Sequence, residues 1–144
     1  MHIFPIVLDN SLRIQGFPLK GLWMDVGRPR DLIKANMAVT KRYGSGGGTI
    51  EKSVLNGTVY VGPESKVQSG ELTDSVILKN SSVVDSCLKN TLVMESCTII
   101  GASIQDSIVG EGCTINAGVV IRNAVLEDGT FIASDTVLDE GREI

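Results

Sequence analysis

The sequence predicts a mainly β protein whose last two thirds form a parallel β-helix of about 16 residues per coil, preceded by one α-helix. Three observations support this prediction: aliphatic residues recur at every fifth or sixth position, small residues recur in step with them, and one stretch with helical periodicity precedes the repeat. The chain has 144 residues, 42% of them hydrophobic, and a formal net charge of −4, which is typical of one ordinary folded domain.

The aliphatic repeat begins at Val61 and places five sets of three anchors along the chain. The sets are Val61, Val67, Leu72; Ile77, Val83, Leu88; Val93, Ile99, Ile104; Val109, Ile115, Ile121; and Leu126, Ile132, Val137. The first anchors of successive sets are 16, 16, 16 and 17 residues apart, with the extra residue between Ile115 and Ile121. Ile50 and Leu55 add a partial coil, so we predict about five and a half coils over residues 50–144.

A period of five to six residues fits neither a helix nor a half-buried strand. It fits a chain that runs a short strand, turns and repeats, with three strands per coil and one anchor per side pointing into a triangular core. Coils stacked at roughly 4.8 Å would align equivalent residues in columns. One such column is small throughout: Ser65, Ser81, Cys97, Cys113 and Thr130. A second set is expected to point inward as well: Val76, Leu92, Ile108 and Val125.

The first 49 residues divide into three parts. Residues 29–43 are predicted to be a helix, because Pro29 suits a first helical turn and an apolar stripe runs from Leu32 to Tyr43. Residues 44–49 form a glycine-rich joint. Ahead of the helix, Ile3 to Leu8 and Leu12 to Phe17 have the pattern of short strands that lack a partner sheet. We therefore expect residues 1–28 to be the end of a larger domain.

Charge and cysteine content exclude several classes of function. Residues 50–144 carry 14 acidic and 6 basic residues, which argues against nucleic acid as a partner. No apolar run is long enough to cross a bilayer, and no signal peptide is recognisable, so we expect no membrane partner and a cytoplasmic location. Cys87, Cys97 and Cys113 lack metal-type spacing and are expected to be reduced, small, buried residues.

The stretch Gly21-Leu22-Trp23-Met24-Asp25-Val26-Gly27-Arg28-Pro29-Arg30-Asp31, continued to Ala35-Asn36, resembles the Trp-x-Asp-x-Gly-Thr-Pro-x-Asp…Ala-Asn segment of sugar-1-phosphate nucleotidylyltransferases. Ile3-Phe4-Pro5 is similar to an element just upstream in that family. The resemblance covers the whole chain, as the end of the catalytic domain plus a C-terminal region that is a left-handed hexapeptide-repeat β-helix in some members. It favours members that act on mannose or glucose 1-phosphate, such as guanylyltransferases and thymidylyltransferases.

The resemblance implies a reaction, a metal and a site residue. The family converts a nucleoside triphosphate and a sugar 1-phosphate into a nucleotide sugar and pyrophosphate. Its Trp-x-Asp aspartate helps to bind Mg²⁺, and this role carries over to Asp25, whose carboxylate is a ligand type that Mg²⁺ accepts. Arg28 stands where the family has Thr, so the usual helix N-cap is missing. The family's N-terminal nucleotide loop and second metal-binding Asp have no counterpart, so no catalytic residue, no cofactor and no activity are expected in this chain alone.

Two other functions compete with this interpretation. Hexapeptide-repeat acyltransferases share the coil architecture but generally need a histidine base, and the one histidine here is His2, outside the coils. The other is a stand-alone structural or oligomerisation module. Four residues that directly follow anchors are expected to form an outward apolar strip for docking: Leu78, Val84, Met94 and Ile100. The expected partners are further copies of the chain, as a homo-oligomer, and a nucleotidyltransferase catalytic domain.

Overall fold

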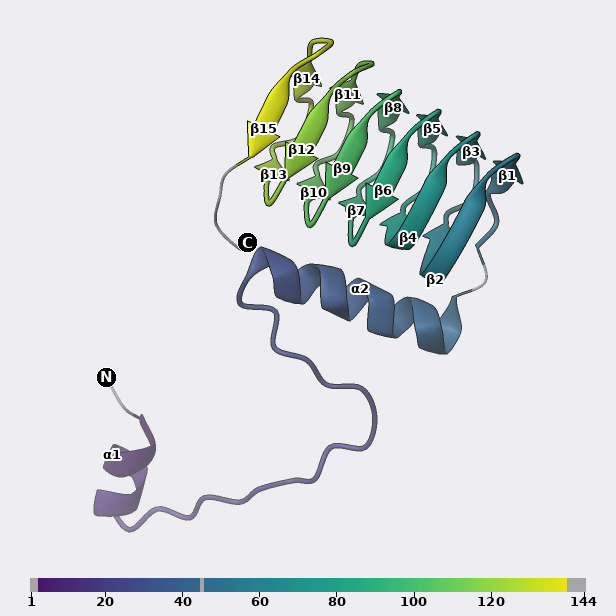
Figure 1. Cartoon of the computed structure of the whole chain (residues 1–144). Coiled ribbons are helices and arrows are strands. Elements are labelled where there is room, and N and C mark those ends of the chain that lie inside the picture. Colours follow the sequence, from purple (N-terminus) through teal and green to yellow (C-terminus); the bar gives the residue numbers. More distant parts are fainter. Residues whose placement is uncertain (1–2, 45, 140–144) are drawn as a thin grey trace.

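The structure is a computed structural model that describes residues 3–44 and 46–139, and this part holds two helices and fifteen strands. The strands wind into a solenoid of about six coils whose stacked turns are seen in Figure 1. All the strand pairs are parallel. The predicted parallel β-helix is therefore confirmed.

Each coil has three sides, which we call faces A, B and C. Face A contains β1 (Thr49–Glu51), β3 (Lys66–Gln68), β5 (Ser82–Val84), β8 (Thr98–Ile100), β11 (Thr114–Ile115) and β14 (Phe131–Ile132). Face B contains β6 (Cys87–Lys89), β9 (Ser103–Gln105), β12 (Val120–Arg122) and β15 (Val137–Asp139), and face C contains β7 (Leu92–Val93), β10 (Ile108–Val109) and β13 (Val125–Leu126). The longer strands β2 (Val54–Val61) and β4 (Glu71–Ile77) bend from face B into face C, which joins these faces into one sheet.

The anchors stack in columns inside the solenoid. Val61 pairs with Ile77, Ile77 with Val93, and Val93 with Val109, as the 16-residue period requires. The extra residue of the fourth coil is also where the sequence places it, because Ile104 pairs with Ile121. The last anchor is wrong by one position: Leu138 pairs with Ile121 and packs on the core, whereas Val137 is 64% exposed. The extra residue of the fourth coil recurs in the fifth, which shifts the inward position by one.

The column of small residues stabilises a corner of the solenoid. The Ser65 hydroxyl donates to the carbonyl of Leu78 at 2.7 Å and accepts the backbone N–H of Ser81 at 2.9 Å. Ser81 repeats this pattern one coil later, with the carbonyl of Met94 and the N–H of Cys97. A small hydroxyl therefore satisfies backbone groups that the turn removes from the strand ladder, which is why larger side chains do not occur there.

Residues in the left-handed backbone conformation turn the chain at the corners. Asp85, Asn90 and Ser96 within one stretch all have positive φ, between 46° and 59°. Asp and Asn are the non-glycine residues that adopt this conformation most readily. At some corners the side chains also bond along the stack, as when the Asn90 amide donates to the Asp106 carboxylate at 2.6 Å.

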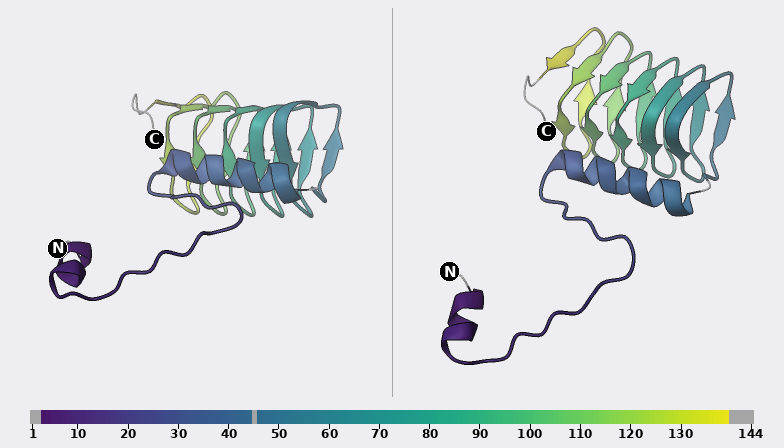
Figure 2. Two further views of the ribbon diagram at one scale, coloured as in Figure 1. Left: turned by 90° about the horizontal axis from the view of Figure 1, so that it is seen from below. Right: turned by 60° about the horizontal axis from the view of Figure 1, so that its bottom comes forward.

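Helix α2 (Pro29–Tyr43) occupies the range predicted from the sequence. It runs along the stack of coils, with its N-terminus at the last coils and its C-terminus at β2 (Figures 1 and 2). Arg28 at its N-cap makes no side-chain capping bond, as the replacement of Thr leads us to expect. Asp31 in the first turn, and Lys41 and Arg42 in the last, suit the helix dipole.

The two strands predicted ahead of α2 are wrong. Ile3–Asp9 forms a short helix, α1, and residues 12–17 have no regular secondary structure. A strand needs a neighbour to satisfy its backbone, and this segment has none, whereas a helical turn satisfies its own groups. The Asn10 side chain supports this turn by donating to the carbonyl of Ile6 at 2.8 Å.

Replacement of the fully buried Leu88 by Ala is expected to lower the free energy of unfolding by about 2 to 5 kcal/mol, because it leaves a cavity in the middle of the stack. Lys89→Ala, one residue further on at an exposed position, is the matched control and is expected to change it by about 0.5 kcal/mol or less. Urea unfolding followed by far-UV circular dichroism measures both. Equal effects of the two replacements would contradict the inward direction of Leu88.

Candidate functional site

The segment that leads into α2 is extended and open to solvent. Residues 12–28 contain no helix or strand, and Trp23 is 70% exposed. Asp25, the predicted metal ligand, lies exposed in this segment, only four residues before Pro29 starts α2. The segment is thus anchored at one end, where α2 packs on the solenoid, and its motif residues face outward.

Asp25 by itself does not fit a magnesium site. Among residues 3–44 and 46–139, no three His, Cys, Asp or Glu residues come together in a group that could hold a metal ion. Mg²⁺ requires six ligands in near-ideal octahedral geometry, of which one exposed carboxylate supplies a small part. The role of Asp25 in metal binding stays a prediction, and it requires ligands from a substrate or from another polypeptide segment.

An apolar interface joins α2 to face C. Ile33, which is 1% exposed, packs with Val76, Leu92 and Ile108, and the half-buried Leu32, Met37, Tyr60, Leu78 and Met94 complete the cluster. The prediction that Val76, Leu92 and Ile108 point inward is wrong. They alternate with the inward anchors, as neighbouring residues of a strand must, and they are buried because α2 covers them. Val125, the fourth of that set, is 43% exposed.

This interface changes the interpretation of two of the four predicted docking residues. Leu78 and Met94 point outward as expected, but they lie against α2 of the same chain. Within the chain, the surface that contacts them is α2. The sequence contains a signal for this contact: the apolar stripe of α2 and the apolar column beside the anchors each need a covering surface.

Val84 and Ile100 lie on face A, which α2 does not cover. They are neighbours in the ladder between β5 and β8, and Ile100 is 43% exposed. Gln68 and Asn116 continue the same outward column on either side. Face A thus presents a short apolar strip with polar ends, and its use in assembly remains a prediction.

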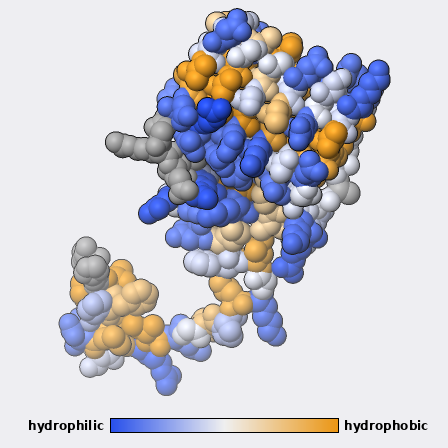
Figure 3. Space-filling model, viewed as in Figure 1, coloured by the Kyte–Doolittle hydropathy of each residue, from blue (hydrophilic) through white to orange (hydrophobic). Residues whose placement is uncertain are grey.

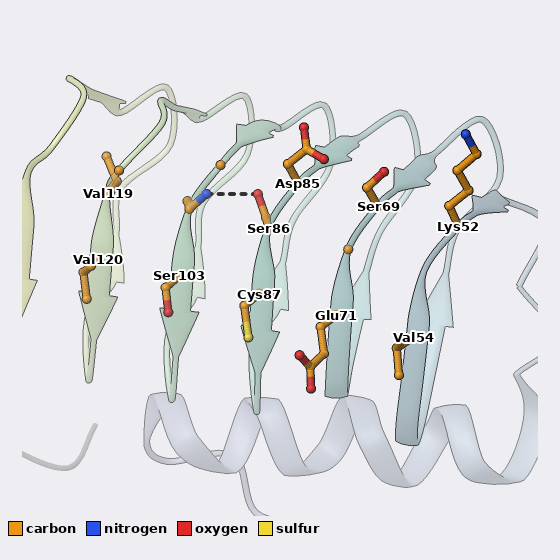
Figure 4. A pocket seen from close by; sticks show the side chains of 14 residues that line it. Lys52, Val54, Ser69, Glu71, Asp85, Ser86, Cys87, Ser103, Val119 and Val120 are labelled. Carbon is orange, nitrogen blue, oxygen red and sulfur yellow. Dashed lines mark hydrogen bonds between the residues drawn. The ribbon is translucent and has the colours of Figure 1, made fainter.

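A shallow hollow of about 490 Å³ follows the corner between faces A and B (Figure 4). Its floor is made of small residues such as Gly70, Ser86 and Ala102, and the Ser86 hydroxyl accepts the N–H of Ala102 at 3.1 Å. Glu71 and Cys87 stand at its edge. The hollow has no histidine at its walls, and His2, the residue that an acyl transfer would need as a base, lies outside the described residues. No motif in the sequence predicts this hollow.

The three cysteines are free, and they differ in environment. Cys97 and Cys113 are buried in the corner column, where their thiols donate to the carbonyls of Gly110 and Glu127 at 3.1 and 3.2 Å. Burial raises the pKa of Cys97 to about 11 and also raises the pKa of Cys113. Cys87 is exposed, so the expectation that all three are buried is wrong for it. Its position in the strand places it outward, next to the inward Leu88.

The fold and the columns define a hexapeptide-repeat type of β-helix, and known proteins of two kinds resemble it. No family model matches the chain. The acetyltransferase domain of PglB from Neisseria gonorrhoeae superimposes with a TM-score of 0.53 over 78% of this chain and 61% of that domain, at 14% identity. A likeness at this level of identity supports the fold.

Three curated relatives are sugar-1-phosphate nucleotidyltransferases. The glucose-1-phosphate adenylyltransferase of Clostridium kluyveri is 26% identical over 60% of this chain and 28% of its own length. The mannose-1-phosphate guanyltransferase of Pichia angusta is 29% identical, over 57% and 29% respectively, and a putative mannose-1-phosphate guanyltransferase of Sulfolobus acidocaldarius is 32% identical, over 51% and 22%. The chain therefore spans less than a third of each relative. These matches confirm the resemblance predicted from the Trp-x-Asp segment.

No helix in the described ranges is both long and apolar enough to span a membrane. Exposed apolar side chains gather on α1 and the segment after it (Figure 3).

Alkylation should distinguish the cysteines, because the thiolate is the reactive form. We expect iodoacetamide at pH 8 to modify Cys87 in the native protein and to spare Cys97, whose pKa of about 11 keeps it protonated. An unfolded thiol loses its proton near its ordinary value of 9.0, so the contribution of Cys97 to stability is complete below pH 9 and is lost as the pH rises towards 11. Peptide mass spectrometry with and without urea measures the labelling. Rapid native labelling of Cys97 at pH 8 would show that the corner column is open.

Proposed function

We propose that this chain is the C-terminal part of a sugar-1-phosphate nucleotidyltransferase and that it serves to hold and assemble the catalytic part. The complete enzyme would transfer a nucleotidyl group from a nucleoside triphosphate to a sugar 1-phosphate, with mannose or glucose 1-phosphate as the favoured substrate. The three curated relatives support the family, and the Trp23-Met24-Asp25 segment supports the position within it.

The observation that carries the proposal is the unburied apolar surface ahead of α2. Eleven large hydrophobic residues between positions 3 and 26 are exposed: Ile3, Phe4, Ile6, Leu8, Leu12, Ile14, Phe17, Leu19, Leu22, Trp23 and Val26. Phe17 and Trp23 are 76% and 70% exposed, although aromatic side chains gain most from burial. Apolar exposure on this scale is typical of a surface that another protein body covers. A catalytic domain that supplies the rest of a sheet would cover it.

The described residues explain how Asp25 is positioned, but they supply few of the groups that nucleotidyl transfer needs. Transfer of a phosphoryl-type group depends on the placement and charge stabilisation of both substrates, mostly by a nucleotide loop and metal ligands. Asp25 contributes one carboxylate towards that task. The α2 helix instead fixes where Asp25 emerges, because its buried face locks it along face C. A structural role for the solenoid and a ligand role for Asp25 in the complete enzyme are therefore compatible.

The acetyltransferase likeness favours a second function less strongly. It extends to the fold alone, and the hollow at the corner of faces A and B lacks a histidine that would deprotonate an acceptor. A stand-alone structural module would leave the apolar segment of residues 3–28 without a function.

Reconstitution tests the proposal directly. Chain 1–144 alone is expected to release no pyrophosphate from nucleoside triphosphates with mannose or glucose 1-phosphate and Mg²⁺, because it has no nucleotide loop. It is expected to bind a polypeptide of the source organism that carries the Gly-rich nucleotide loop, as measured by size-exclusion chromatography with light scattering. Trp23 is the single tryptophan, so fluorine NMR of 5-fluorotryptophan in this chain should show one resonance that shifts on binding.

Asp25→Asn is the matched control, since it is expected to preserve binding while it lowers turnover of the assembled enzyme by about tenfold or more. Pyrophosphate release by the isolated chain, or a lack of binding to every such polypeptide, would contradict the proposal.

Assembly of copies is expected to use face A. Replacing both Val84 and Ile100 by Lys should convert an oligomer into a folded monomer, because charges would be buried in the contact. Lys66→Ala on the same face is the control. Light scattering measures the mass, and an oligomer that survives the double replacement would exclude face A as the contact.

A further inference from the structure

The outward surface of the last coil differs from that of the coils before it. Phe131 on β14 is 68% exposed. Its partner in the ladder is Thr114, and the same column continues with Thr98, Ser82 and Lys66, so every earlier residue is polar. An aromatic side chain at the last position is not required by the strand, because Thr occupies the equivalent place in three coils, as Thr49, Thr98 and Thr114.

Face C shows the same change at the same coil. Ile108, Leu92 and Val76 are 5% exposed or less, since α2 covers them. Val125 is their successor in the ladder and is 43% exposed. Residues 127–130 form the corner between Val125 and Phe131, and Glu127 and Asp128 there are exposed. We call Val125, Glu127, Asp128 and Phe131 the last-coil patch.

The segment of residues 3–28 leaves the solenoid at this same end. Helix α2 begins at Pro29 beside the last coils, as both views in Figure 2 and the view in Figure 1 show. Val26 and Trp23, which are 47% and 70% exposed, precede Pro29 by three and six residues. An extended chain spans at most about 3.5 Å per residue, so these side chains start within about 10 and 20 Å of the helix. Any body that buries them must therefore lie close to the last coil.

Charge also favours a contact at this end. Residues 1–49 carry 7 basic and 3 acidic residues, and residues 50–144 carry 6 and 14. Glu127 and Asp128 belong to the acidic part, while Arg28 stands next to the start of α2. A body that includes the basic segment is electrostatically complementary to the acidic corner.

We propose that the last-coil patch is a docking surface for the folded catalytic domain that also buries residues 3–28. This inference rests on the proposed function and adds the place of the contact. A second copy stacked end to end is the other candidate occupant. It would meet the open strand edges of the last coil and leave Val125 and Phe131 uncovered, because outward side chains stand perpendicular to the faces and not along the stack.

The test uses replacements by Thr, a residue that fits outward positions of these strands. Val125→Thr with Phe131→Thr removes the apolar patch and places at position 131 the residue found at positions 98 and 114. Val137→Thr is the matched control, because Val137 is also exposed in the same coil, at 64%, but begins the strand of face B, at the corner away from face C. The probe is the source organism's polypeptide with the Gly-rich nucleotide loop, and affinity is measured by biolayer interferometry, with circular dichroism melting as the check on folding.

We expect the double replacement to weaken binding at least tenfold, the control to change it less than twofold, and neither to alter the melting temperature by more than a few degrees. Wild-type binding that the double replacement leaves unchanged would overturn the docking surface while leaving the proposed function intact. An absence of wild-type binding to any such polypeptide would overturn both. A wild-type dimer that the double replacement converts to monomer would assign the patch to a second copy, which also overturns the inference.

Discussion

The structure depends on the stacking of aliphatic side chains in a core that is one residue wide on each side. Each coil supplies three anchors, and each anchor is buried only because the coils above and below it present an equivalent residue. Val67, Val83 and Ile99 are fully buried in the middle of one column, whereas Ile50 at its open start is 43% exposed. No coil has a core of its own, so burial, backbone pairing and the corner hydrogen bonds form together along the stack.

The repeat was predictable because this packing leaves a strict period. Anchors at every fifth or sixth residue and small residues at one corner follow from three sides of fixed length, and they identified the columns down to the extra residue before Ile121. The error at Val137 has the same origin. A period read from earlier coils does not reveal a second insertion, and Val137 and Leu138 are equally aliphatic, so only the ladder with Ile121 decides between them.

The positions of α2 and of the docking residues were less predictable because they depend on contacts between distant parts of the chain. The alternation of neighbouring strand residues made Leu78 and Met94 outward, but it did not say that residues 29–43 would cover them. Residues 3–8 were mispredicted because the contact that their pattern suits is missing from this structure. Their apolar pattern suits a strand in a larger sheet, and without a partner the same residues form the short helix α1. Asp25 was identified by resemblance, and spacing along a sequence does not show whether other ligands gather around it; within residues 3–44 and 46–139 no three potential metal ligands form a group.

The length of α2 has a consequence for how this architecture changes in size. Its 15 residues rise about 22 Å, which equals between four and five coil spacings of about 4.8 Å. The length of the helix is therefore matched to the length of the stack that it covers. Loss or gain of a whole coil would preserve every column. It would, however, move the start of α2 relative to the end of the solenoid by one coil spacing, about 4.8 Å, and the Trp23 segment would move with it. A change in the number of coils would thus also change which part of the solenoid the Trp23 segment lies next to.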